Sequence, residues 1–130
     1  MILQTTLTLA AAAVFINLWL FVRVVRVRMA ERVIHGDGGN TLLLQRMRAQ
    51  SNFIEHAPLF LILVASIELT GKGDSWLAVV GSLFMLARVS HGFGMDRAGS
   101  NLFRAGGMVV TLLTEIGLAV VAVLIGLQLM

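Results

Sequence analysis

The sequence contains no cysteine and only one proline, Pro58, in 130 residues. Without cysteine the chain has no disulfide, no thiolate metal ligand and no thiol nucleophile, so any sulfur chemistry must come from a substrate. Charge is also scarce, since 13% of the residues are charged and 58% are apolar. Soluble proteins average about 25% charged residues. The composition therefore indicates a protein whose solvent is lipid.

Charged side chains are absent from the first 22 residues, and the basic residues begin at Arg23. A secretory signal peptide has its positive charges before its apolar core, so we expect this segment to be retained as a membrane span. The net charge of +3 comes mostly from arginines that flank apolar runs. Membrane topology and lipid headgroups explain such a pattern, and we expect no nucleic-acid partner.

Three polar, glycine-containing stretches divide the chain, namely HGDGGN at 35–40, TGKGDS at 70–75 and MDRAGSN at 95–101. A membrane span needs about 20 apolar residues, and we predict helices over roughly 3–29, 41–69, 75–95 and 101–130. Their short connections make sequential helices antiparallel. The predicted fold is all-α, with residues 1–130 forming one domain, an integral membrane four-helix bundle.

The arginines are distributed unevenly among the three connections. All nine lie near the loop that follows the first helix or the loop that follows the third, whereas the loop after the second helix has only Lys72. Positively charged loops stay in the cytoplasm. We therefore expect both chain termini to face away from the cytoplasm.

The stretch RMRAQSNFIEHAPLF at 46–60 places polar side chains at the start of an apolar helix. At about 100° per residue, one stripe of the helix holds Gln45, Arg48, Asn52, Glu55 and Leu59. Arg48 and Glu55 are about 10 Å apart along the axis, so the stripe descends into the apolar layer, where charged groups face the bundle interior or a wet cavity. In a purely structural interpretation, Glu55 pairs with Arg48 or with an arginine of a neighbouring helix and fixes helix register.

Further arginines at the same level favour a ligand over this structural interpretation. The Glu55 carboxylate cannot neutralise all of these arginines. They are Arg26, Arg28, Arg88 and Arg104. The surplus fits an anionic ligand with two carboxylates and one amine. Arginines would bind the carboxylates of this ligand, and Glu55 would bind its ammonium group. Asn52 and Gln50 would form hydrogen bonds with its peptide groups.

The segment RAQSNFIEHAPLF closely resembles the helix-two signature of the membrane-associated proteins in eicosanoid and glutathione metabolism, the MAPEG family, Arg-Ala-Gln-x-Asn-x-x-Glu-Tyr-x-Pro-Leu-Phe. The resemblance extends to ARVSHGFGM at 87–95 and to Arg104. The GDGGN loop makes the chain more similar to the bacterial branch, which implies a bacterial inner membrane. The resemblance also implies a homotrimer that binds glutathione as co-substrate between protomers, near the cytosolic face.

By this resemblance, the activity is that of a glutathione S-transferase or peroxidase acting on lipophilic electrophiles. Glutathione would contact Arg48, Asn52 and Glu55, with Gln50 alongside and Arg104 from helix four. Arg26 or Arg28 would be catalytic, because a cation beside a thiol lowers its pKa, and the sequence does not choose between them. The other expected glutathione-binding residues are His56, Arg88 and His91.

The chain departs from the family pattern at its aromatic positions. His56 stands where the family usually has tyrosine, His91 replaces another, and the chain contains no tyrosine. A member that keeps the scaffold without catalysis is therefore one alternative. A small proton-coupled multidrug exporter is another, but it needs a carboxylate in helix one, and the first 22 residues have none.

Two remaining features receive a structural interpretation. No histidine pair has metal-ligand spacing with a carboxylate on the same face, so we expect no metal. Glu115 lies deep in helix four, where a carboxylate is a functional candidate by default. Its neighbours Thr111 and Thr114 favour a polar contact between helices instead.

Overall fold

A computed structural model describes residues 1–130 and contains four helices. They are α1 (Gln4–Glu31), α2 (Thr41–Leu69), α3 (Ser75–Gly94) and α4 (Leu102–Gly126). The predicted all-α four-helix fold is confirmed, and each helix is long and apolar enough to span a membrane. α1 extends past Met29 to Glu31, where Arg32 adopts a left-handed conformation and its N–H bonds to the Arg28 carbonyl. α4 ends at Gly126, short of the predicted Met130.

Side chains that accept hydrogen bonds fix where the helices begin. Asn40 accepts from the Leu43 N–H at the start of α2, and Asn101 accepts from the Arg104 N–H at the start of α4. α1 has no side-chain cap of its own. Instead Glu68, at the end of α2, accepts from the N–H groups of Thr5 and Thr6, both at 2.8 Å. A carboxylate at this position satisfies free donors at the positive end of the helix dipole.

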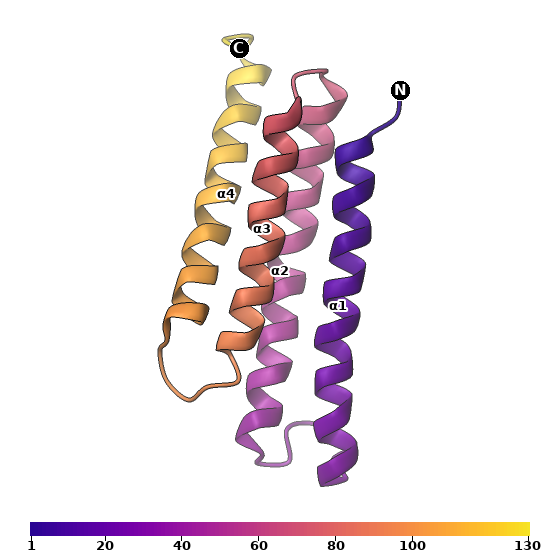
Figure 1. Ribbon diagram of the computed structural model, residues 1–130, viewed down its shortest axis with the longest axis vertical. Helices are drawn as coiled ribbons and strands as arrows, with labels where there is room; N and C mark the ends of the chain where they lie inside the picture. The colour runs from indigo at the N-terminus through magenta and orange to yellow at the C-terminus, as the bar shows by residue number, and fades with distance from the viewer.

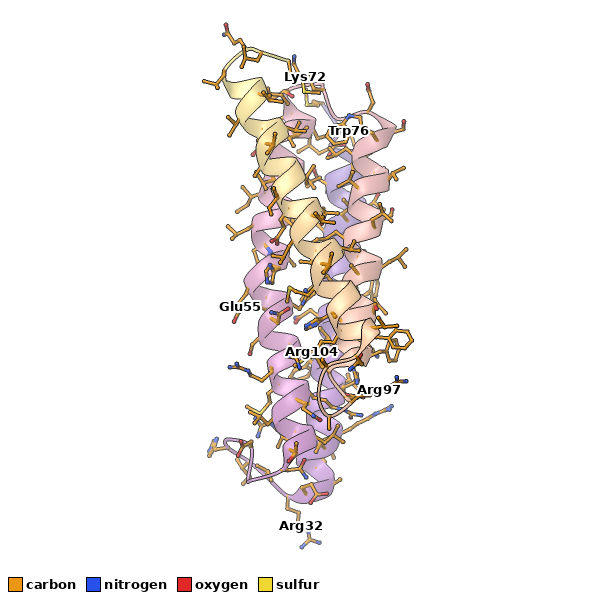
Figure 2. The ribbon with its side chains drawn as sticks, turned by 90° about the vertical axis from the view of Figure 1, so that its left-hand side faces the viewer. Arg32, Glu55, Lys72, Trp76, Arg97 and Arg104 are labelled. Carbon is orange, nitrogen blue, oxygen red and sulfur yellow. The ribbon has the colours of Figure 1, made fainter.

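The helices form an antiparallel bundle in which α2 and α3 lie between α1 and α4 (Figure 1). α1 and α4 do not contact each other. Both termini and the α2–α3 loop lie at one end of the bundle, and the α1–α2 and α3–α4 loops lie at the other. The arginines therefore gather at one end of the molecule. Figure 2 shows Lys72 and Trp76 at the opposite end from Arg32, with Glu55 between.

Apolar residues from all four helices form the core. At its centre the rings of Phe60 on α2 and Phe84 on α3 are stacked, with centroids 3.8 Å apart, and both side chains are fully buried. α1 contributes Leu20, and α4 contributes Leu118. This packing holds α2 and α3 together between the arginine-rich end of the bundle and the end that contains the termini.

Gly107 allows α3 and α4 to approach closely. A Cβ atom at this position would lie 2.6 Å from the Ala87 carbonyl oxygen and 2.8 Å from the His91 nitrogen. Small residues permit such contact between membrane helices. The adjacent Gly106 has open space around it. The close approach sets the position of α4 beside the arginine-rich end of α2 and α3.

Candidate functional site

A pocket of about 460 Å³ lies between α2 and α4 and is closed at one side by the end of α3. Seven of its ten lining residues are not hydrophobic. The stripe predicted on α2 supplies Arg48, Asn52 and Glu55, while α3 supplies His91, and Arg104 lies on the opposite wall. The rest of the lining consists of Ser51, Met95, Ser100, Ala105 and Met108. The stripe thus faces a cavity on the flank of the bundle.

Three charged side chains of the pocket have no ionic partner within the chain. The ion pairs that form are Arg23 and Arg46 with Asp96, and the Glu115 carboxylate contacts His56. Arg48, Glu55 and Arg104 are exposed and belong to none of these pairs. Glu55 thus pairs neither with Arg48 nor with an arginine of a neighbouring helix, the contacts that the purely structural interpretation requires. Two guanidinium groups and one carboxylate are therefore free to bind a ligand.

Arg88 is buried behind the pocket and does not line it. Its side chain is 1% exposed and donates to Asn52 Oδ1 and, at 3.2 Å, to Thr111 Oγ1. Its second terminal nitrogen also lies 3.5 Å from His91 Nδ1. These contacts fix the orientation of two residues that line the pocket, Asn52 of α2 and His91 of α3. Burying a guanidinium is expensive unless several hydrogen bonds satisfy it.

His56 contacts α4 instead of lining the pocket. Its Nδ1 lies 3.0 Å from both carboxylate oxygens of Glu115, and the two side chains are each 20% exposed. The polar contact expected for Glu115 is therefore made between helices, with His56 as the partner. Thr111 and Thr114 bond to carbonyls of their own helix.

The α1 arginines lie away from the pocket. Arg28 donates to the carbonyl oxygens of Ile34 and Gly36 and so binds the loop that follows its own helix. Arg26 is exposed on α1, which does not touch α4. Gln50 donates to Asn17 of α1 at 3.3 Å. Within one chain, the predicted residues thus divide into a group at the pocket and a group on the α1 side of α2.

Asp96 was not foreseen as an important residue. It pairs with Arg23, and its two carboxylate oxygens lie 3.3 Å from Arg46 Nε and from an Arg46 terminal nitrogen. Arg23 also donates to the Gly92 carbonyl and lies 4.7 Å from the Trp19 ring centroid. Two of the nine arginines therefore share one carboxylate in a structural clamp that joins α1, α2 and the end of α3.

Comparison with known proteins gives a family and two relatives. The model of the MAPEG family matches residues 6–124. Inner membrane protein YecN of Escherichia coli K12 is 35% identical over 82 residues, as is YecN of Escherichia coli O6:H1 strain CFT073. The aligned region covers 62% of this chain and 60% of the length of each relative.

Proposed function

Because this chain belongs to the MAPEG family, we propose that it binds glutathione in the pocket between α2 and α4. We further propose that it is a transferase or peroxidase, which joins the glutathione sulfur to lipophilic electrophiles or uses it to reduce lipophilic hydroperoxides. Its relatives are inner membrane proteins by name, and we infer the same membrane for this chain. The arginine-rich end would then face the cytoplasm, where glutathione is available.

The observation that carries the proposal is the set of unpaired charges in the pocket. Arg48 on α2 and Arg104 on α4 line it from two helices, with Glu55 between them and the bilayer interior. Glutathione has two carboxylates and one ammonium at neutral pH, which matches two guanidiniums and one carboxylate. Arginine suits this task because its planar donors bind carboxylates through two parallel hydrogen bonds. Asn52 adds an amide that can bond to a peptide group.

The arrangement of the remaining predicted residues supports assembly from several copies. Gln50 and Arg26 lie on the α1 side, so one chain cannot direct them into its own pocket. A neighbouring copy could present its α1 side to the open flank of the pocket and complete the site. The proposed homotrimer provides such a neighbour for each of three pockets, since a cyclic arrangement repeats one interface until the ring closes.

The reaction requires the thiolate form of glutathione, because the thiolate is the nucleophile. A cation close to the sulfur favours that form, and Arg26 of a neighbouring copy is a candidate. Arg28 is less available, since loop carbonyls already occupy its guanidinium. Met108 gives the pocket an apolar wall on α4. A lipophilic substrate would enter from the bilayer on that side.

The test is the rate of glutathione conjugation to an activated aryl chloride by the purified protein in liposomes. Arg104→Leu and Glu55→Gln should raise the KM for glutathione about tenfold to a hundredfold, because each removes a charge-assisted hydrogen bond. Arg97→Leu is the matched control, since Arg97 is an exposed arginine near Arg104 whose guanidinium lies over Phe103 outside the pocket. Glutathione binding without any conjugation or peroxide reduction would identify a non-catalytic family member. Equal KM values in all variants would contradict the proposed site.

A further inference from the structure

The pair formed by His56 and Glu115 joins α2 to α4 close in sequence to residues that line the pocket. His56 follows the pocket residue Glu55 directly and comes one turn after Asn52, about 6 Å along the helix axis. Glu115 comes two turns after Met108, which lines the same pocket from α4. Both side chains keep 20% of their surface exposed. The pair therefore lies deeper in the bundle than the pocket residues Asn52 and Met108, on the side from which a lipophilic substrate would reach the glutathione sulfur.

The hydrogen bond to Glu115 determines which nitrogen of His56 can act as a base. An ionised carboxylate only accepts hydrogen bonds, so Nδ1 must carry the proton that lies between them. In the neutral imidazole Nε2 then has the free lone pair, and no hydrogen bond within the chain engages it. A carboxylate that orients imidazole in this way also stabilises the imidazolium that forms on protonation. The geometry is that of a general base.

The charged and titratable groups around His56 come from α2, α3 and α4. Arg88 and His91 lie on α3, Glu115 lies on α4, and Glu55 and His56 lie on α2. Arg88 has no ion-pair partner within 4 Å, and the acids that act on it electrostatically are Glu115 and Glu55. A thiolate formed beside this layer would gain a favourable interaction with the Arg88 guanidinium, while Glu115 offsets the new charge on His56.

We propose that His56, oriented by Glu115, accepts the thiol proton of bound glutathione. This inference rests on the proposed glutathione site. In this step the S–H bond breaks, sulfur keeps the electron pair, and the proton is transferred to Nε2 to give a thiolate and an imidazolium. The proton can return to the leaving oxygen of a hydroperoxide or to the carbon of a conjugate adduct, and where chloride leaves it is released to water. His56 is then the catalytic base, and Glu115 is a positioning residue.

The experiment measures two quantities on each variant of the detergent-purified protein, namely glutathione affinity by calorimetry and thiolate absorbance of the saturated complex as a function of pH. His56→Phe should keep glutathione affinity within a few-fold and lose about tenfold of the thiolate at pH 7, the loss expected when a thiol returns from an activated to an ordinary pKa. Glu115→Gln should lose part of the thiolate signal at pH 7. His35→Phe, in the exposed α1–α2 loop, should match the wild type.

A further variant separates proton transfer from helix packing. The double substitution His56→Leu with Glu115→Leu replaces both partners by apolar groups, which usually preserves stability where removal of one partner does not. It should bind glutathione and still lack the thiolate. A full thiolate signal in this variant or in His56→Phe would overturn the proposal. Loss of the thiolate signal in Arg26→Ala alone would assign activation of the glutathione thiol to that arginine. Failure of the wild type to bind glutathione would refute the proposed function itself, whereas binding without thiolate would refute only the base.

Discussion

Replacing Gly107 by alanine should destabilise the contact between α3 and α4. The added methyl carbon would lie 2.6 Å from the Ala87 carbonyl oxygen and 2.8 Å from the His91 backbone nitrogen, whereas ordinary contacts begin at 3.4 Å. Both obstacles are helical backbone, which cannot rotate away as a side chain can. α4 must therefore shift by several tenths of an ångström along its contact with α3, or tilt.

The expected cost is about 1–3 kcal/mol, the usual range for overpacking a well-packed site. Gly106→Ala is a matched control on the adjacent residue, where an added methyl meets nothing within 4 Å. That control should be neutral or slightly stabilising, because alanine favours helix over glycine by about 1 kcal/mol. The two substitutions are chemically identical, so their difference isolates the helix contact.

Thermal unfolding of both variants in one detergent is the appropriate assay. Gly107→Ala should unfold at a clearly lower temperature than Gly106→Ala. Because His91 lines the pocket and its backbone is one of the obstacles, glutathione affinity should also fall in Gly107→Ala alone. Equal unfolding temperatures for the two variants would refute the packing of α4 against α3 described above.

The polar contacts at the two ends of the bundle make separate predictions. Asp96→Asn leaves the buried Arg23 guanidinium without its carboxylate and should lower the free energy of unfolding by about 1–3 kcal/mol. Asp74→Asn is the control and should change it little, because the Asp74 side chain caps α3 without a hydrogen bond. Similar denaturation midpoints for these two variants would argue against the clamp. Glu68→Gln weakens the cap of α1 and should cost about 1 kcal/mol, with faster amide exchange at Thr5 and Thr6; unchanged exchange there would show that Glu68 does not cap the helix.

Helix number, order and the polar stripe could be predicted because they follow from local patterns. Polar glycine-containing loops separate the apolar runs, and the 3.6-residue period places Arg48, Asn52 and Glu55 on one face of α2. The same period places Gln50 about 200° from Arg48 and hence on the opposite face. Its assignment to the ligand beside Asn52 disregarded this period, and within one chain the structure directs it toward Asn17.

Contacts between helices could not be predicted from the sequence, because they depend on how far each helix slides and rotates against its neighbours. The pairing of His56 with Glu115 needs the relative position of α2 and α4. The two ion pairs of Asp96 need the position of the α3 end beside α1 and α2. A count of arginines therefore overestimated the positive charge that one chain presents in the pocket, since Arg28 binds loop carbonyls and Arg88 is buried.

The proposed function depends on glutathione binding by the unpaired charges of the pocket between α2 and α4. Calorimetric titration of glutathione into the detergent-purified wild type, Arg48→Leu and Arg97→Leu measures this binding. We predict saturable binding to the wild type and to Arg97→Leu, and affinity about tenfold to a hundredfold weaker in Arg48→Leu. Equal affinity in all three proteins, or no binding to the wild type, would contradict the account.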